Sequence, residues 1–157
     1  MRIFLVRHGE AVPEEDAGSD RDRWLSPRGR EAVRVLARLL RSLPVEPDAI
    51  MSSPLPRAVQ TAELLAQGLD YLREIRSLRS LEPAAHPRVA ADALLATGGS
   101  VIVVGHSPSI MSLGALLLGV PSFPSFYTAQ CFAIEDKQPT FSARADLEQI
   151  VPYFMER

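Results

Sequence analysis

Short apolar runs alternate with segments of helical periodicity along this chain, and that alternation constrains its fold more than any other feature. Four of the runs have the length of short strands: 2–6, 49–52, 74–78 and 101–104. Helical segments are expected to lie between and after them, at 27–43, 56–67, 88–96 and 108–118. This order predicts an α/β fold, a three-layer sandwich in which helices cover both faces of a mostly parallel central sheet.

Four further segments need separate interpretation. Residues 131–135 and 141–147 alternate enough to predict two further strands, an antiparallel pair at one edge of the sheet. Residues 12–24 are acidic and without period, so a surface loop is expected there, one that either overhangs a site or is merely solvated. Ser26 followed by Pro27 is typical of the N-cap and first residue of a helix.

Composition narrows the possible classes of protein. With 157 residues, 46% of them apolar and 23% charged, the chain can bury its own core, and one domain over 1–157 is expected. A net charge of −2 argues against nucleic acid or an anionic membrane as partner. The longest apolar run, 110–120, is too short to span a bilayer, and the N-terminus lacks signal-peptide zones, so a cytoplasmic location is expected. One cysteine and three histidines offer few metal ligands, and neither a metal nor a cofactor is expected.

Polar, phosphate-compatible residues follow three of the predicted strands. Arg7 and His8 come directly after the first strand, with Gly9 allowing close approach of a ligand. Arg57 lies near the start of the helix that follows the second strand, where a guanidinium and helix amides suit an oxyanion. His106 follows the fully apolar strand at 101–104.

Each of these residues also has an ordinary structural interpretation. Taken alone, the Arg7 to Glu10 segment is equally well interpreted as a polar strand end followed by a turn. Arg57 can be a solvated arginine at a helix start, and His106 can be a structural hydrogen-bonding group. Ser107 is equally well read as a helix N-cap. Because the carboxyl ends of parallel strands share one edge of a sheet, all three groups are expected at the same edge. Their convergence is the evidence for an anion site.

The segments 5–10, 52–62 and 103–110 closely resemble, in order and spacing, the motifs of the histidine phosphatase superfamily. The short chain, the 24–29 helix start and the terse 81–83 segment are most similar to the SixA-type phosphohistidine phosphatases. This resemblance implies that His8 is a nucleophile carrying a transient phosphoryl group, while Arg7, Arg57 and His106 bind that group without metal. The backbone N–H of Ser107 is a further donor candidate.

The proton donor is the open point of the resemblance. The broader superfamily takes a carboxylate from the segment after the third strand, and Glu82 is the nearest match, although SixA-type members often lack this acid. Glu10 is a further candidate binding residue, whereas His86, before Pro87 in a loop, is expected at the surface.

The leading hypothesis is therefore a phosphatase acting on phosphohistidine of a protein, within phosphorelay signalling. One alternative is a phosphatase for small phosphomonoesters that uses Glu82 as general acid, because an ester needs a proton donor that a phosphohistidine does not. Another is a non-hydrolytic phosphohistidine carrier or a phospho-ligand binding module. A mutase would need a closed site, for which the chain has little room.

Overall fold

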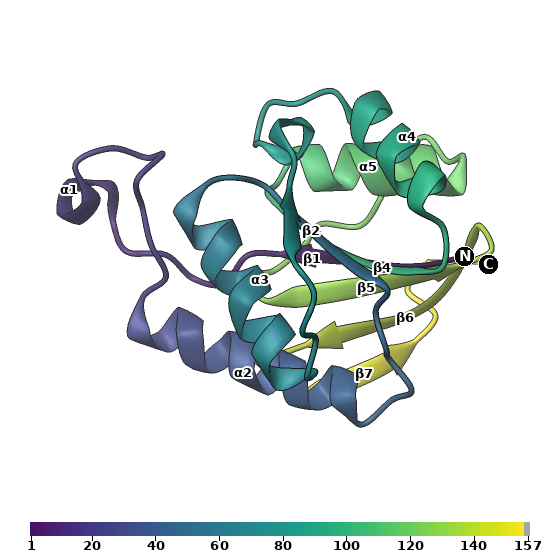
Figure 1. Ribbon diagram of the computed structural model, residues 1–157, viewed down its shortest axis with the longest axis horizontal. Helices are drawn as coiled ribbons and strands as arrows, with labels where there is room; N and C mark the ends of the chain where they lie inside the picture. The colour runs from purple at the N-terminus through teal and green to yellow at the C-terminus, as the bar shows by residue number, and fades with distance from the viewer. Residues whose placement is uncertain (156–157) are drawn as a thin grey trace.

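The computed structural model describes residues 1–155, which form one mixed seven-stranded sheet flanked by helices (Figure 1). The elements in chain order are β1 (Arg2–Arg7), α1 (Glu14–Ala17), α2 (Pro27–Arg41), β2 (Ala49–Ser52), α3 (Pro56–Gly68), β3 (Ile75–Ser77), η1 (Arg79–Leu81), α4 (Pro87–Thr97), β4 (Ser100–Gly105), α5 (Ser109–Leu118), β5 (Gln130–Glu135), β6 (Gln138–Arg144) and β7 (Gln149–Pro152). The predicted α/β fold is confirmed.

The strand order β3-β2-β4-β1-β5-β6-β7 divides the sheet into two halves. β3, β2, β4 and β1 are mutually parallel, whereas β5 pairs antiparallel with β1, and β6 and β7 continue antiparallel. The antiparallel part therefore has three strands where the sequence predicted two, and it begins beside β1. β4, which contains the fully apolar run 101–104, lies in the interior of the sheet between β2 and β1, as expected for a strand buried on both faces.

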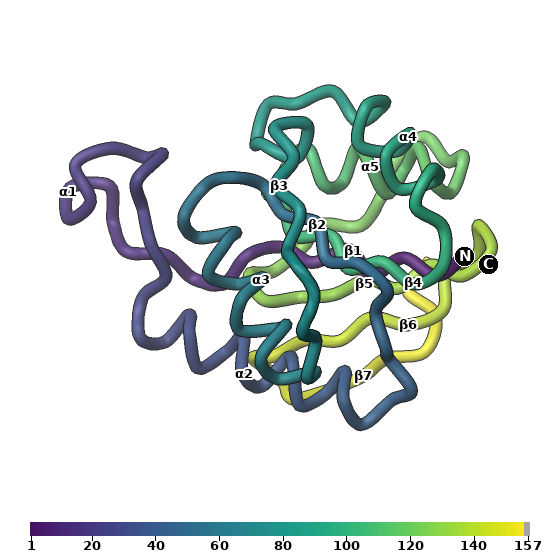
Figure 2. Tube along the Cα trace, in the orientation of Figure 1, coloured from purple at the N-terminus to yellow at the C-terminus, as the bar shows by residue number. Residues whose placement is uncertain are grey.

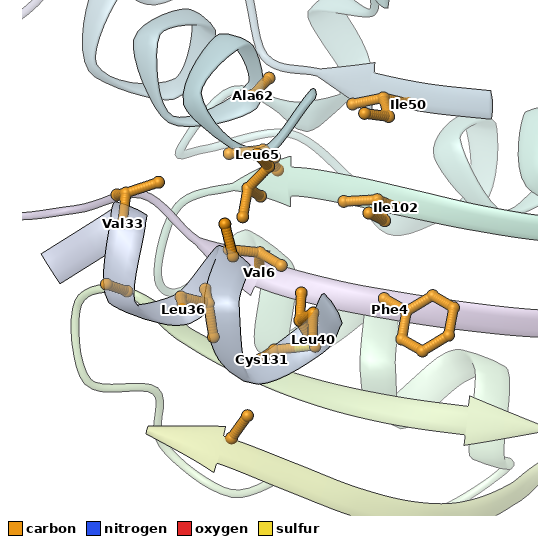
Figure 3. Close-up of a cluster of buried hydrophobic side chains, with 14 of the residues drawn as sticks. Phe4, Val6, Val33, Leu36, Leu40, Ile50, Ala62, Leu65, Ile102 and Cys131 are labelled. Carbon is orange, nitrogen blue, oxygen red and sulfur yellow. The ribbon is translucent and has the colours of Figure 1, made fainter. Parts of the chain in front are cut away.

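Helices cover both faces of the sheet. Successive side chains along a strand point to opposite faces, so the apolar side chains on each face have to be covered. Alternate side chains of β1, Phe4 and Val6, lie in the cluster that also holds Leu36 and Leu40 of α2 and Leu65 of α3 (Figure 3). The neighbouring β1 side chains point to the opposite face, into the cluster formed with α4 and α5. In α2 the buried residues recur at helical spacing, so one stripe of the helix packs on the sheet.

Local signals set the start of α2 as predicted. The Ser26 side chain accepts a hydrogen bond from the Gly29 N–H at 3.0 Å, and Pro27 is the first helical residue. The loop expected over 12–24 contains one helical turn, α1, and is closed at its base by a hydrogen bond from the Val12 N–H to the Trp24 carbonyl at 2.8 Å. Figure 2 shows this segment projecting from the body at the end of the molecule away from the two termini.

Strand order also decides which chain segments meet at the carboxyl edge. Because β2, β4 and β1 are neighbours, the residues that follow them lie side by side. The His8 N–H donates to the Gly105 carbonyl at 3.2 Å, and the Ser53 N–H donates to the Val104 carbonyl at 3.0 Å. Among residues 1–155, no helix is long and apolar enough to cross a membrane.

Candidate active site

A pocket of about 320 Å³ opens at this carboxyl edge. It is lined by the four residues that the sequence predicted to meet there. Arg7 and His8 reach it from the end of β1, Arg57 from the first turn of α3, and His106 from the end of β4. The complete lining is Arg7, His8, Glu10, Ala11, Asp20, Arg23, Arg57, Pro83, His106, Ser107 and Thr128. The predicted convergence of these strand ends is therefore observed.

His8 is held as a neutral imidazole with one defined free nitrogen. Its Nδ1 lies 2.7 Å from the Gly9 carbonyl oxygen, which can only accept, so Nδ1 carries the proton and Nε2 keeps its lone pair. Burial lowers the pKa of His8 to about 4; the Gly9 hydrogen bond opposes this shift, and the charges of Arg57, Arg7 and Arg23 add to it. The side chain is 7% exposed. A neutral ring with an unprotonated nitrogen is the form that can act as a nucleophile.

Thr61 ties the two main segments of the site together. The Gly9 N–H donates to the Thr61 Oγ1 at 3.0 Å, and that hydroxyl donates to the Arg57 carbonyl at 2.8 Å. A Cβ at Gly9 would lie 2.9 Å from both the Gly29 carbonyl oxygen and the Val33 side chain, so only glycine fits this close crossing. The end of β1 and the start of α3 are thus fixed relative to each other.

His106 presents a second buried imidazole beside the first. The two ring centroids are 5.0 Å apart, and burial, with His8 and Arg57 nearby, lowers the pKa of His106 to about 3. Its Nε2 lies 2.8 Å from the Ser53 Oγ, which already accepts from the Leu55 N–H at 3.2 Å. Among the hydrogen bonds of the described residues, Nε2 is the acceptor that the Ser53 hydroxyl proton can reach, and this arrangement favours the tautomer with the proton on Nδ1 of His106.

The two arginines are each only partly engaged by protein. Arg7 Nη1 donates to the Phe126 carbonyl at 2.9 Å. Arg57, which is 4% exposed, donates from Nη1 to the Asp20 carbonyl at 2.7 Å and from Nη2 to the Asp20 carboxylate at 3.3 Å. In both guanidinium groups the Nε–H is buried and has no partner.

Unpaired polar atoms gather in this one pocket. Within residues 1–155, the buried side-chain nitrogen and oxygen atoms that lack a hydrogen-bond partner are Arg7 Nε, Arg57 Nε, His106 Nδ1 and Ser107 Oγ, and all four residues line the pocket. Each such group costs about 1–3 kcal/mol when nothing satisfies it. Three N–H donors and a hydroxyl in the same pocket as the lone-pair nitrogen of His8 are suited to the oxygens of a tetrahedral anion.

The remaining predicted residues lie at the margin of the pocket or outside it. Glu82 does not line the pocket, although its neighbour Pro83 does, and its Oε1 accepts a hydrogen bond from Arg21 Nη1 at 2.6 Å. Glu10 lines the pocket and accepts from the Ser26 hydroxyl at 3.2 Å. His86 is exposed, as predicted, and its Nδ1 accepts from the Arg88 N–H at 3.2 Å, which caps α4.

The N-cap interpretation of Ser107 is wrong. Helix α5 begins at Ser109 and its N-cap is Pro108. A cis peptide bond joins Ser107 to Pro108. Ser107 stays outside the helix, with its hydroxyl among the unpaired atoms of the pocket, because the chain turns there before the helix starts.

Several residues of the site carry no signal in the sequence that predicts them there. Asp20 and Arg23 come from the aperiodic 12–24 segment, Thr128 from the stretch before β5, and Thr61 and Ser53 act behind the pocket lining. No periodicity or motif marks Asp20 or Arg23 within their loop. Across residues 1–155, no group of three or more histidine, cysteine or carboxylate side chains is arranged to hold a metal ion.

The chain combines an α/β fold with two buried histidines and two arginines at the carboxyl edge of its sheet. Comparison with known families identifies the class of protein to which the chain belongs. The family model described as "Histidine phosphatase superfamily (branch 1)" matches residues 3–83, and the chain belongs to this superfamily of enzymes.

Within that superfamily the chain is similar to particular proteins. It is 32% identical over 133 residues to the phosphohistidine phosphatase SixA of Escherichia coli K12, an alignment covering 82% of this chain and 81% of that protein. A solved structure of the protein histidine phosphatase SixA complexed with tungstate superposes with a TM-score of 0.87 at 27% identity, covering 95% of this chain and 100% of that one. A phosphoserine phosphatase of Entamoeba histolytica, at 16% identity and a TM-score of 0.69 over 88% of this chain and 93% of that one, shares the fold.

Proposed function

We propose that this protein is a phosphohistidine phosphatase that transfers the phosphoryl group of a phosphorylated protein to His8 and then to water, without a metal ion. The observation that carries the proposal is the set of four unpaired polar atoms on residues that line the same pocket as His8, whose Nε2 keeps its lone pair. The similarity to a SixA bound to tungstate, a tetrahedral oxyanion, supports the same use of this pocket. A substrate of this kind fits a cytoplasmic role in phosphorelay signalling.

Binding of the phosphoryl group would use donors that are already in place. The guanidinium groups of Arg7 and Arg57, the Nδ1–H of His106 and the hydroxyl of Ser107 supply positive charge and hydrogen bonds to the oxygens. Phosphoryl transfer needs positioning and charge stabilisation more than covalent assistance. The two arginines provide the charge that a divalent cation provides in other phosphoryl-transfer enzymes.

In the first step, Nε2 of neutral His8 attacks phosphorus while the bond between phosphorus and the leaving nitrogen breaks, and that nitrogen keeps the electron pair. The Gly9 carbonyl holds the Nδ1 proton of His8, so the ring stays oriented as its Nε2 becomes phosphorylated. In the second step, the oxygen of a water molecule bonds to phosphorus while the bond between phosphorus and Nε2 of His8 breaks. The protons of the water leave with inorganic phosphate, and Nε2 regains its lone pair.

The position of Glu82 supports a phosphohistidine substrate over an ester. An alkyl ester needs a placed proton donor for its leaving oxygen, and the Glu82 carboxylate is outside the pocket lining and paired with Arg21. An imidazole leaves without such help. The alternative of a small phosphomonoester phosphatase requires Glu82 to exchange Arg21 for the substrate.

The deciding experiment measures phosphate release by the wild type and Glu82→Gln from a phosphohistidine-bearing protein and from glycerol phosphate, an alkyl ester, with EDTA throughout. We expect fast release from the phosphoprotein by both enzymes, and none by His8→Ala. Ester hydrolysis that exceeds phosphohistidine hydrolysis and depends on Glu82 would contradict the proposal. A phosphorylated His8 that water does not discharge would establish a carrier instead.

A further inference from the structure

Asp20, like Glu10, places a carboxylate in the lining of a pocket whose arginines attract anions. Its carbonyl oxygen accepts from Arg57 Nη1 at 2.7 Å, its Oδ2 accepts from Arg57 Nη2 at 3.3 Å, and its Oδ1 accepts from Arg23 Nη1 at 3.2 Å. The side chain remains 56% exposed and lines the pocket beside His8 and His106. A carboxylate beside a phosphoryl dianion is repulsive, so its presence disfavours phosphate binding as such.

The segment that carries Asp20 is anchored rather than loose. Arg21 is paired with Glu82 at 2.6 Å, Arg23 Nε donates to the Val12 carbonyl at 2.7 Å, and Arg23 also holds Asp20 itself. These contacts tie the 12–24 segment to Glu82, whose neighbour Pro83 lines the pocket, and to the base of the segment itself. Figure 2 shows this projecting segment. Asp20 is thus held in the lining of the same pocket as the phosphate donors, mainly by its contacts with Arg23 and Arg57.

The chemistry of a phosphoimidazole explains what a carboxylate can do there. In phosphohistidine one ring nitrogen carries the phosphoryl group and the other can carry a proton, which gives the leaving ring a positive charge. A carboxylate that accepts a hydrogen bond from this N–H stabilises the protonated, reactive form. A phosphate ester has no such N–H and meets only the repulsion.

We infer that Asp20 is a specificity-determining residue that accepts a hydrogen bond from the free N–H of the substrate's phosphohistidine ring and so selects a phosphoimidazole over a phosphate ester. The inference rests on the proposed function. As the new bond forms between phosphorus and Nε2 of His8, the bond between phosphorus and the substrate nitrogen breaks, and its electron pair stays on that nitrogen. The substrate ring leaves as neutral imidazole with its proton still on the nitrogen that faces Asp20, so no proton donor is required.

The hydrogen bond to Arg23, together with the charge of Arg57, lowers the pKa of Asp20 and keeps it ionised. The carboxylate is therefore available as an acceptor throughout the neutral range. Its exposure leaves room for a substrate ring to approach it from the solvent side of the pocket.

The test compares Asp20→Asn with the matched control Asp22→Asn on two substrates, free phosphohistidine and p-nitrophenyl phosphate. Asp22 lies in the same loop, does not line the pocket, and accepts a hydrogen bond from the Ser19 hydroxyl at 2.8 Å. Asn at position 20 keeps the shape and the carbonyl contact to Arg57 but removes the charge. Free phosphohistidine is used because it excludes effects of protein docking.

For Asp20→Asn we expect kcat/KM for phosphohistidine to fall by about tenfold to a hundredfold, the worth of a charge-assisted hydrogen bond, while kcat/KM for the ester stays at or above the wild-type value. Asp22→Asn should match the wild type on both substrates. An equal change on both substrates, or a change confined to faster ester hydrolysis, would overturn the inference, because Asp20 would then act only on the fold or on the phosphoryl group. A wild type that hydrolyses the ester but not phosphohistidine would instead refute the proposed function.

Discussion

Thr61 offers the sharpest test of how the site is held together, because one hydroxyl connects the Gly9 N–H to the Arg57 carbonyl. Thr61→Val keeps the size of this fully buried side chain but leaves the Gly9 N–H without a partner. An unsatisfied buried N–H costs about 1–3 kcal/mol in the free energy of unfolding. For a chain of this size each kcal/mol lowers Tm by about 2–4 °C. We also expect kcat/KM to fall by about tenfold to a hundredfold, because His8 and Arg57 would lose their fixed spacing.

The assay is urea unfolding together with phosphohistidine hydrolysis, with Thr61→Ser as the control that keeps the hydroxyl and removes the methyl group. The serine variant should lose some stability through the small cavity but keep most of its activity. A valine variant as stable and as active as the wild type would refute the reasoning. Equal losses of activity in both variants would show that packing of the methyl group, and not the hydroxyl, positions the site.

Three further predictions concern neighbouring groups. Histidines of the unfolded chain have a pKa near 6.5, whereas the pKa is lowered to about 4 in folded His8 and to about 3 in folded His106. Between these values the unfolded state binds more protons than the folded state. The free energy of unfolding should therefore fall as the pH drops from 6.5 toward 4. Urea titrations at several pH values should show this slope, and a slope unchanged in His8→Asn would contradict its assignment to His8. Gly9→Ala should lower the free energy of unfolding by about 1–3 kcal/mol through contact with the Gly29 carbonyl, and an unchanged urea midpoint would disprove the close crossing. Ser53→Ala should lower kcat/KM by about tenfold because His106 Nε2 loses the partner that sets its tautomer, whereas an unaltered kcat/KM would exclude that role.

The amino-acid sequence determined the fold class and most of the pocket. Apolar runs short enough for strands, separated by stretches of helical period, indicated the α/β order, since each signal is local and depends on burial of one face or two. Arg7, His8, Arg57 and His106 could be predicted at one edge because each follows a strand or starts the next helix. Because the carboxyl ends of parallel strands lie at one edge of the sheet, these four residues then lie close together.

Tertiary structure alone decided the features that depend on contacts between distant segments. The sequence placed the late strands as a pair at an edge, but β5 pairs with β1 and a third strand, β7, follows, because strand partners are chosen across the sheet and not along the chain. Asp20 reaches Arg57 across 37 residues, and Arg21 reaches Glu82 across 61. No local pattern encodes such pairings, since they arise only when the packed core fixes the 12–24 segment over the edge of the sheet.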